Sequence, residues 1–365
     1  MKVAVFGAAG ALGRRVLSRL IEADLVTGLV AADHDTALLA GLHSRLGHLG
    51  VAVRFMEAAD PRSFRERMSG CDAVISCLGG EGADELPPAA EAVERGALYL
   101  SPTEEPSVFL RDREASRGEG DGLAVMGLGW SPGLSNLLAA WAGRRFQRLD
   151  EIGVAWRLDA RELNSPGGRE RLLNAFGGKC LSFEEGRLRE VQAGSWEEWV
   201  PFPPDSSPGS VAYARGPEPL TLPRLFPQAL RVRLKGGLAQ PHLHLPVHTA
   251  SWASSLLPEP FRELLVHAVG MTLSKAGGAP GEAVSALRVE LKGLRGGERH
   301  HLAVGATGGY LDATAAMLVG ALFLLLRSPK RPRGILAPEE ALELRGILPA
   351  LRREGVRFWM ESGRI

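Results

Sequence analysis

Three glycines near the start of the chain constrain its fold more than any other feature. Gly7, Gly10 and Gly13 follow a short strand-like run, Lys2–Phe6, and open a segment with apolar residues at helical spacing, Ala11–Ala23. A glycine-rich turn between a strand and a helix lets the backbone approach a pyrophosphate at the helix N-terminus. The spacing therefore predicts a dinucleotide-binding loop. The residues expected to contact the cofactor are Gly7, Ala9, Gly10, Ala11, Leu12 and Gly13.

An acidic residue lies where such a loop requires one. Asp33 stands about 20 residues after Gly13, at the end of a second predicted strand, Val26–Ala32. A carboxylate at this place accepts a hydrogen bond from the ribose 2′-OH and repels a 2′-phosphate. The sequence therefore predicts NAD as the cofactor, with NADP as the alternative.

Strand and helix patterns alternate up to about residue 140. Short apolar runs such as Val51–Met56, Ala73–Ser76 and Leu123–Met126 are mostly separated by helical patterns. Strands that alternate with helices form a parallel sheet that is covered on both faces. This order predicts an α/β fold with an N-terminal dinucleotide-binding domain of the Rossmann type.

The pattern changes after Asp150 to that of a second, α+β domain. Further strand-like runs follow glycine- and proline-rich turns, which favours a mixed, largely antiparallel sheet. The predicted strands are Glu151–Leu158, Leu230–Leu234, His242–Val247 and Ala286–Leu291. The predicted helices are Glu259–Ser274 and Ala313–Arg327, before a final helix and strand.

Composition argues against several classes of partner. The 43 Lys and Arg residues nearly balance the 42 Asp and Glu residues, so the net charge of +1 favours neither nucleic acid nor an anionic membrane. The basic run Arg327–Arg333 has two prolines and no aromatic residue, and we interpret it as a solvated loop. Three cysteines cannot form a disulfide framework, which indicates a reducing, cytoplasmic setting.

One apolar segment, Ala313–Leu326, requires a buried environment. Its length of about 14 residues is below the about 20 that span a bilayer, and the start of the chain lacks the pattern of an export signal. We interpret the segment as a helix buried in a core or in a subunit interface. The interface interpretation predicts a homodimer, and a purely internal position is the alternative.

Two common oxidoreductase chemistries find little support in the sequence. None of the three tyrosines is followed four residues later by a lysine, which excludes the Tyr–Lys pair of short-chain dehydrogenases. Cys71 and Cys77 flank or end a predicted strand and are interpreted as buried apolar residues. Cys180 stands in a turn-rich stretch, where burial is favoured over a role as nucleophile.

A histidine-rich segment provides a candidate for proton transfer. His242 and His244 fall on one face of a predicted strand, with His248 beyond Pro246. They have no accompanying cluster of Cys, Asp or Glu, so we predict no metal site. His244 is a candidate acid–base residue, with a hydrogen-bonded position in the sheet or an interface as the alternative. Arg233, on a neighbouring strand, is a candidate for binding a substrate carboxylate, although an exposed sheet face explains it as well.

Three further segments together resemble one family. Gly127–Asn136 (GLGWSPGLSN), Gly96–Leu100 (GALYL) and Gly334–Glu340 (GILAPEE) are similar, and in the same order, to segments of the saccharopine dehydrogenase-like family. The resemblance implies a Rossmann domain of residues 1–132 with 308–365, and a substrate and dimerisation domain of residues 133–307. It also implies an NAD(P)-dependent oxidoreductase that transfers hydride at a CH–NH or CH–NH2 group. The substrate would be a small amino-acid-like molecule or its imine.

The resemblance implies a place for the nicotinamide and for the substrate. The nicotinamide is expected between the loop after Ser76 and the turn at Pro132–Gly133. Residues expected to line it are Cys77, Leu78, Gly79, Gly80, Trp130 and Pro132. Residues expected to face the substrate are Ser101, Ser131, Gly133, Asn136 and Arg233.

Two positions depart from the family pattern. Ser101 and Ser131 stand where family members often carry Asp near the substrate amine. Glu104 or Glu105, just after the same strand as Ser101, could supply a carboxylate, and Glu104 is the second candidate for proton transfer. A solvated loop is the alternative for both glutamates. The two departures also leave a second function open, that of a non-catalytic dinucleotide-binding sensor or regulator.

Overall fold

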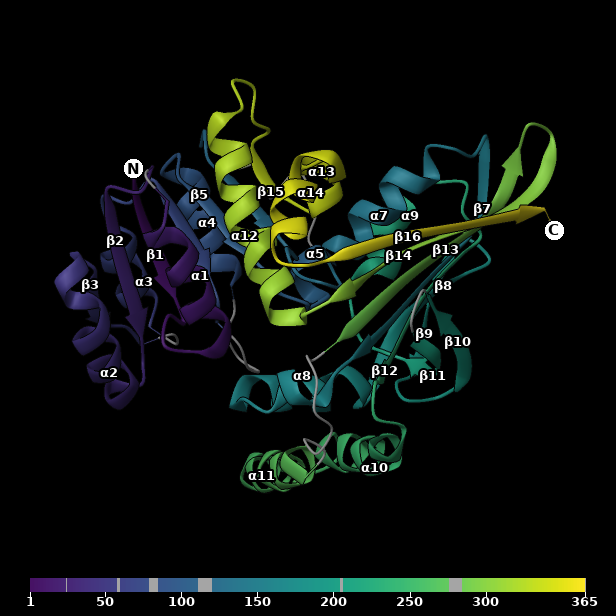
Figure 1. Ribbon diagram of the computed structural model, residues 1–365, viewed down its shortest axis with the longest axis horizontal. Helices are drawn as coiled ribbons and strands as arrows, with labels where there is room; N and C mark the ends of the chain where they lie inside the picture. The colour runs from purple at the N-terminus through teal and green to yellow at the C-terminus, as the bar shows by residue number, and fades with distance from the viewer. Residues whose placement is uncertain are drawn as a thin grey trace. The chain divides into compact units, whose positions relative to one another are not determined.

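Two sheets, one in each of two units, organise the computed structural model (Figure 1). The structure describes residues 1–23, 25–57, 60–78, 85–110, 120–203, 206–275 and 284–364. The first unit comprises residues 1–103, 110–129 and 311–351. The second unit comprises residues 104–109, 130–310 and 352–365.

The sheet of the first unit is parallel. Among the described residues it has seven strands in the order β15-β6-β5-β4-β1-β2-β3, and every neighbouring pair is parallel. The strands are β1 (Lys2–Phe6), β2 (Gly28–Asp33), β3 (Ala52–Phe55), β4 (Ala73–Ser76), β5 (Leu98–Ser101), β6 (Leu123–Met126) and β15 (Gly334–Leu336). Strands β4, β5 and β6 are buried along their whole length, as strands covered on both faces are. The predicted α/β fold is confirmed.

Helices cover both faces of this sheet. They are α1 (Ala11–Ile21), α2 (Thr36–Leu46), α3 (Pro61–Met68), α4 (Leu86–Glu94), α12 (Tyr310–Arg327), α13 (Pro338–Ala341) and α14 (Leu344–Arg353). Asp312 of α12 binds Arg15 and Arg19 of α1 at 3.1 and 3.0 Å, so α1 and α12 are neighbours on one face. The right-handed connection from β3 back to β4 places α3 on the opposite face.

Helix α12 contains the apolar segment predicted from the sequence. It spans 18 residues, and it is the one helix in the described part of the chain that is long and apolar enough to cross a membrane; 61% of it is buried. Its buried residues include Met317, Leu318 and Leu322. Gly320 approaches Ala350 of α14, where a Cβ atom on Gly320 would lie 3.0 Å from the Ala350 Cβ. The segment is therefore buried within the first unit, between α1 and α14.

The sheet of the second unit is mixed and largely antiparallel, as predicted. Its main path runs β10-β11-β12-β7-β13-β14-β16, with β8 and β9 attached beside β12. Within the described chain, β7 and β12 are the parallel pair of this sheet. The strands are β7 (Arg148–Leu158), β8 (Lys179–Glu184), β9 (Arg187–Gln192), β10 (Glu198–Phe202), β11 (Ser206–Tyr213), β12 (Arg231–Leu238), β13 (Ser285–Arg295), β14 (Glu298–Gly308) and β16 (Arg357–Arg364).

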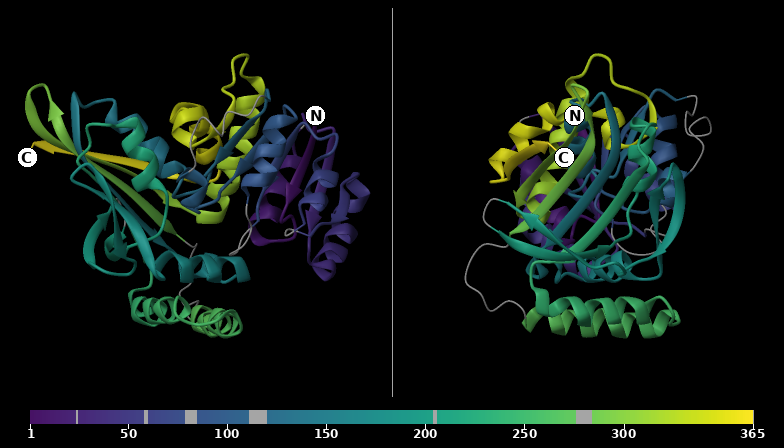
Figure 2. Two further views of the ribbon diagram at one scale, coloured as in Figure 1. Left: turned by 180° about the vertical axis from the view of Figure 1, so that it is seen from behind. Right: turned by 90° about the vertical axis from the view of Figure 1, so that its right-hand side faces the viewer.

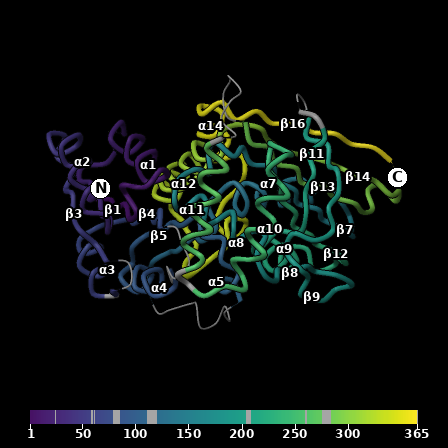
Figure 3. Tube along the Cα trace, turned by 90° about the horizontal axis from the view of Figure 1, so that it is seen from below, coloured from purple at the N-terminus to yellow at the C-terminus, as the bar shows by residue number. Residues whose placement is uncertain are grey.

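Two helical layers flank this second sheet (Figures 1 and 2). The helices are α5 (Ser107–Leu110), α7 (Leu134–Gly143), α8 (Pro166–Phe176), α9 (Glu218–Leu225), α10 (His244–Ser254) and α11 (Glu259–Lys275). Helices α7 and α9 lie on one side of the sheet and α8 lies on the other, where Phe176 contacts Trp156 of β7 with a centroid distance of 5.7 Å. Helices α10 and α11 lie side by side and pack on α8 (Figure 3).

The structure corrects three local predictions. The predicted strand His242–Val247 is helical, in the short 3-10 helix Pro241–Leu243 and the start of α10. Pro241 and Pro246 fix φ near the helical value, which a first helical turn accepts and a central strand does not. Cys180 lies buried in strand β8 and not in a turn. Residues 352–365 belong to the second unit and not to the first, because β16 pairs with β14.

Glycines opposite tryptophans allow a test of how tightly the second sheet is packed. Gly305 of β14 pairs with Trp359 of β16, and a Cβ atom on Gly305 would lie 2.2 Å from the Trp359 ring and 2.2 Å from the Leu287 carbonyl oxygen. We expect Gly305→Ala to lower the free energy of unfolding by about 1–3 kcal/mol, the usual effect of overpacking. Urea denaturation followed by circular dichroism measures it.

Gly153→Ala is the matched control for this variant. Gly153 lies in central strand β7, where the nearest atom to an added Cβ is 4.0 Å away. Because glycine loses more backbone entropy on folding than alanine does, this control should be neutral or stabilising. Equal stability of the two variants would contradict the packing described here.

Candidate functional site

The glycine loop after β1 has the shape that a dinucleotide requires. Gly7 has a φ of 69°, and a Cβ atom there would lie 2.5 Å from the Cys77 carbonyl oxygen. A Cβ atom on Gly13 would lie 2.1 Å from the Gly7 carbonyl oxygen. Both positions therefore require glycine, since the loop is folded against itself and against the end of β4.

Gly10 is less crowded than Gly7 and Gly13 in this loop. An added Cβ would meet only the Gly7 carbonyl oxygen, at 3.2 Å, among atoms that the structure places within 4 Å. Gly10 is the N-cap of α1, and no described side chain caps this helix. The backbone N–H groups of a first helical turn lack intrahelical partners and favour an anion. The residues of Gly7–Gly13 thus fit the pyrophosphate of NAD(P).

Asp33 is buried at the end of β2 and binds the loop directly. Its Oδ2 accepts a hydrogen bond from the Ala9 N–H at 2.8 Å. Its Oδ1 accepts from the N–H groups of His34 and Asp35 at 2.8 and 3.2 Å. His34 Nδ1 also lies 3.2 Å from Oδ1, whereas Oδ2 has only the Ala9 contact among those described, so its second lone pair remains for a ribose hydroxyl. Asp33 therefore positions the loop as well as providing an acceptor for the ribose.

The other predicted residues of the first unit lie at the carboxyl ends of β4 and β5. The Cys77 N–H donates to the Phe6 carbonyl at 2.8 Å, and burial raises the pKa of the Cys77 thiol far above its usual range. Leu78 follows it, and its N–H points to the Ser76 hydroxyl at 3.5 Å. Ser101 is buried, and its Oγ accepts from the Thr103 N–H at 3.1 Å. Gly79 and Gly80 lie outside the described residues.

The remaining cysteines also have raised pKa values. Burial raises the pKa of Cys71, and it raises the pKa of Cys180 to about 12, although Arg215 opposes the second shift. A thiol with such a pKa carries almost no thiolate at neutral pH, and the thiolate is the nucleophile. The three cysteines are therefore unsuited to covalent catalysis.

The predicted substrate residues of the second unit form a buried hydrogen-bond network. Asn136 accepts from the Gly133 N–H at 3.0 Å and donates through Nδ2 to the Thr221 hydroxyl of α9 at 2.9 Å. The hydroxyls of Ser131 and Ser135 donate to the Glu218 carboxylate at 2.5 and 2.9 Å. These contacts fix the turn of residues 130–136 to the start of α9.

Glu104 lies beside this network. It forms an ion pair with Arg171 of α8, and Arg171 also donates to the Ser131 carbonyl at 3.4 Å. Burial raises the pKa of Glu104 to about 7; Arg171 acts against this shift, whereas the Glu218 carboxylate adds to it. A carboxyl group with this pKa exchanges protons readily at neutral pH.

Two buried donors of the second unit, one of them on the arginine that pairs with Glu104, have no described hydrogen-bond partner. Trp130 Nε1 and Arg171 Nη1 are buried, and neither has a hydrogen-bond partner among the residues that the structure describes. The Arg171 guanidinium also stacks over the Tyr310 ring, with its central carbon 4.5 Å from the centroid. Buried donors normally have partners. Arg171 contacts the carbonyl of Ser131, the residue after Trp130, and a buried guanidinium N–H suits an oxygen of a carboxylate.

Two residues predicted from the sequence have structural partners instead. His244 is buried at the start of α10, and its Nε2 lies 3.0 Å from the Leu238 N–H nitrogen at the end of β12. Its ring stacks with His248 at a centroid distance of 5.9 Å. Arg233 donates to both oxygens of Glu184 at 2.6 and 3.2 Å, and Arg231 binds the same carboxylate at 2.8 Å. Across the described residues, no group of three His, Cys, Asp or Glu side chains could hold a metal.

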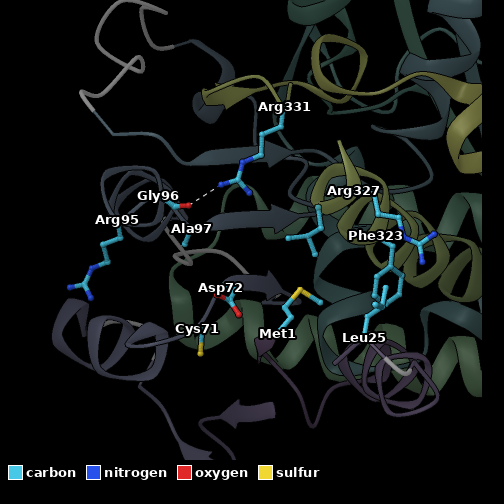
Figure 4. Close-up of a pocket in the computed structure, with 11 residues that line it drawn as sticks. Met1, Leu25, Cys71, Asp72, Arg95, Gly96, Ala97, Phe323, Arg327 and Arg331 are labelled. Carbon is cyan, nitrogen blue, oxygen red and sulfur yellow. Dashed lines mark hydrogen bonds between the residues drawn. The ribbon is translucent and has the colours of Figure 1, made fainter. Parts of the chain in front are cut away.

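A separate cavity of about 650 Å³ opens in the first unit (Figure 4). Met1, Asp72 and Ala97 line it and precede β1, β4 and β5, which places the cavity at the amino edge of the sheet. Dinucleotides bind at the carboxyl edge of such sheets. This cavity is therefore distinct from the place of the glycine loop. Figure 4 shows Arg331, which donates to the Gly96 carbonyl at 3.1 Å across one side of the cavity.

Comparison with known proteins supports the interpretation of the first unit. A family model described as NAD(P)H-binding matches residues 7–96, which include the glycine loop and Asp33. The comparison with curated protein sequences gave no match. The first unit thus carries an NAD(P)H-binding domain, as the glycine spacing predicts.

Comparison with solved structures concerns the whole chain. Apo saccharopine dehydrogenase (L-Glu forming) from Saccharomyces cerevisiae is 12% identical, with 99% of each chain covered and a TM-score of 0.63. An engineered D-amino acid dehydrogenase is 12% identical over 95% of this chain and 96% of that chain, with a TM-score of 0.45. The WlbA dehydrogenase from Thermus thermophilus is 15% identical over 96% and 92%, with a TM-score of 0.41. The first of these similarities confirms the predicted resemblance at the level of the fold.

The Gly13 position provides a test of the cofactor loop. We expect Gly13→Ala to weaken NADH binding by about tenfold or more, because the added Cβ would overlap the Gly7 carbonyl and displace the loop. Titration of NADH fluorescence measures the dissociation constant. Gly41→Ala in α2 is the control, since nothing lies within 4 Å of its added Cβ. Unchanged NADH affinity in Gly13→Ala would argue against this loop as the cofactor site.

The Asp33 carboxylate provides a test of cofactor choice. We expect the wild type to bind NADH more tightly than NADPH, and Asp33→Asn to reduce that preference by about tenfold, because the negative charge that repels a 2′-phosphate is removed. Asp35→Asn is the control, since Asp35 caps α2 through the Leu38 N–H and Asn caps equally well. A wild type that prefers NADPH would contradict this assignment.

Proposed function

We propose that this protein is an NAD(P)-dependent oxidoreductase that acts on the carbon–nitrogen bond of an amino acid or of its imine. The observation that carries the proposal is the pair of Glu104 and Arg171, which combines a carboxyl group titrating near neutrality with a buried guanidinium N–H that has no partner among the described residues. The NAD(P)H-binding domain and the fold shared with saccharopine dehydrogenase support the same class of reaction.

The cofactor, when bound, supplies or accepts the hydride. The chain's own contribution to holding it comes from the glycine loop, which receives the pyrophosphate, and from Asp33, which receives a ribose hydroxyl. Strand β1, which leads into the loop, and the adjacent strand β4 are buried, so the glycine loop and Asp33 are held in place before the cofactor binds. Such preorganisation lowers the entropic cost of binding.

Arg171 and Trp130 bind the substrate in this proposal. The Nη1–H of Arg171 and the Nε1–H of Trp130 each donate a hydrogen bond to an oxygen of the substrate carboxylate. Contact of the Arg171 guanidinium with the Tyr310 ring and with Ser131 restricts its position. A fixed carboxylate orients the adjacent carbon–nitrogen bond, which is how binding energy remote from the reacting atoms contributes to rate.

Glu104 moves the proton. In the oxidative direction it takes a proton from the substrate ammonium group, and in the reductive direction it returns one to the nitrogen. Its pKa of about 7 suits both directions, because an acid–base group is most effective when its pKa lies near the working pH. Glu218 assists indirectly, since its negative charge disfavours the ionised form of Glu104.

Turnover with defined substrates tests the proposal. The purified protein is incubated with NADH or NADPH and a panel of 2-oxo acids paired with ammonia or amino acids, and with NAD or NADP and amino acids. We expect a change in absorbance of the nicotinamide with at least one pair. Tight cofactor binding without turnover on any pair would instead favour a dinucleotide-binding sensor, consistent with the serines at positions 101 and 131.

The pH profile tests the role of Glu104. In the oxidative direction kcat/KM should rise with pH through an apparent pKa of about 7, because the ionised carboxylate is the base. Glu104→Gln should abolish this rise and lower kcat about 100-fold or more. Glu105→Gln is the matched control, since Glu105 is exposed and pairs with Arg215 at 3.2 Å. A Glu104→Gln variant with the wild-type profile would rule out this base.

A further inference from the structure

The cavity at the amino edge of the parallel sheet takes no part in the proposed reaction. Its volume of about 650 Å³ is that of a small-molecule site, yet it opens at the edge of the sheet opposite to the glycine loop. A second cavity of about 520 Å³ adjoins it, because Leu326 and Arg331 line both. The residues that line the two cavities all belong to the first unit, and we call the pair of cavities the amino-edge site.

The basic run Arg327–Arg333 supplies much of the positive charge of the amino-edge site. Arg327 lies in the last turn of α12, where one cation is expected because it offsets the helix dipole. Lys330 and Arg331 follow the helix, so the dipole does not account for them. Among the described residues, none of these three cations has a carboxylate partner. The site therefore holds positive charge that the described part of the fold leaves unneutralised.

The other arginines of the site are already paired with acids. Arg333 pairs with Asp121 at 2.5 Å, and Arg95 pairs with Glu91 at 2.6 Å. Asp72 accepts a backbone N–H through Oδ2 at 2.7 Å and has no ion-pair partner among the described side chains. The described side chains of the site thus carry three unpaired cations and one unpaired acid, which favours an anionic ligand that also has hydrogen-bond donors.

Arg331 is held in place for binding an anion. Its Nη2 donates to the Gly96 carbonyl, just before β5, at 3.1 Å (Figure 4). A guanidinium has several N–H donors, so this contact fixes its position and leaves other donors for a ligand. Arginine matches two phosphate oxygens at once, and a phosphate carries more negative charge than a carboxylate. Three unpaired cations in adjoining cavities therefore suit a chain of phosphates better than a single carboxylate.

An aromatic ring and two leucines, Leu25 and Leu326, line the same site. Phe323 and Arg327 are four residues apart on α12, so their side chains lie on the same side of the helix (Figure 4). Phe323 is half-buried and Leu25 is 48% exposed, which leaves apolar surface for a ligand to cover. A nucleic-acid base stacks on an aromatic ring of this kind. Asp72 suits the hydroxyls of a ribose, because a carboxylate accepts hydrogen bonds.

We propose that the amino-edge site binds a nucleoside diphosphate, as a second nucleotide site besides the glycine loop. The base lies against Phe323 and Leu25, and the phosphates bind Arg327 and Arg331. A nucleic-acid strand fits less well, because the described lining offers a single aromatic ring and the whole chain has a net charge of only +1. The proposal does not depend on the reaction that the protein catalyses.

Isothermal titration calorimetry with ADP tests the site in protein saturated with NADH, so that the glycine loop is occupied. We expect the wild type to bind one further nucleotide per chain. Arg327→Gln and Arg331→Gln should each raise the dissociation constant of ADP about tenfold or more, because each removes a cation that faces the phosphates. Phe323→Leu should weaken ADP binding but leave the affinity for inorganic pyrophosphate unchanged, since it removes only the ring on which the base stacks.

Two comparisons make these results specific to the amino-edge site. Arg45→Gln removes an exposed arginine from the last turn of α2, which packs beside the edge strand β3, and should leave ADP binding intact. Gly13→Ala without NADH should still bind ADP at this site. Circular dichroism and the thermal midpoint establish that each variant remains folded. A wild type that binds no ADP beside NADH, an ADP affinity unaffected by Arg327→Gln and Arg331→Gln, or pyrophosphate bound as tightly as ADP would each overturn the proposal.

Discussion

A carboxylate without exposed surface constrains the second unit more than any other group. Glu218 is fully buried, and a buried charge is stable only where hydrogen bonds replace the water that it has lost. The hydroxyls of Ser131 and Ser135 donate to it and thereby fix the turn of residues 130–136 to α9. The same charge adds to burial in raising the pKa of Glu104. The hydrogen bonds that Glu218 requires thus hold the turn of residues 130–136 in its shape, and the charge of Glu218 raises the proton affinity of Glu104.

The parts of the fold that sequence reasoning predicted are those that depend on local pattern. The glycines at positions 7, 10 and 13 and the alternation of apolar runs with helical segments predict the parallel sheet, because each signal lies within a few residues. The segment His242–Val247 alternates like a strand, but Pro241 and Pro246 favour the first turns of helices, and the structure follows the prolines. The strand β16 was predicted, whereas its partner was not, since pairing with β14 depends on residues far away in the sequence.

In the candidate site, too, the residues that serve a local turn could be predicted from the sequence, and those that meet only in the tertiary structure could not. The cofactor loop could be predicted because its glycines and Asp33 serve one local turn. Glu104 was a candidate only through the family resemblance, and Arg171 and Glu218 were missed. Arg171 lies in an amphipathic helix with other charged residues, and Glu218 occupies a first helical turn, where acids are common. Nothing in the local sequence distinguishes Arg171 or Glu218 from a charged surface residue. Only the tertiary structure brings each of them to the turn of residues 130–136; Glu218, for example, is 87 residues away from its partner Ser131 in the sequence.

The interleaving of the two units affects how the chain can fold during its synthesis. Helix α12 and strand β15 belong to the first unit, yet a ribosome makes them only after most of the second unit. Until then, β6 lacks one of its two neighbouring strands, β15, and the face that α12 covers is open to water in the nascent chain. The ion pair of Arg15 with Asp312 joins residues 297 positions apart, the kind of contact that slows folding. The cofactor domain, although it begins first, is therefore completed late in translation, and its apolar face stays accessible to chaperones in the meantime.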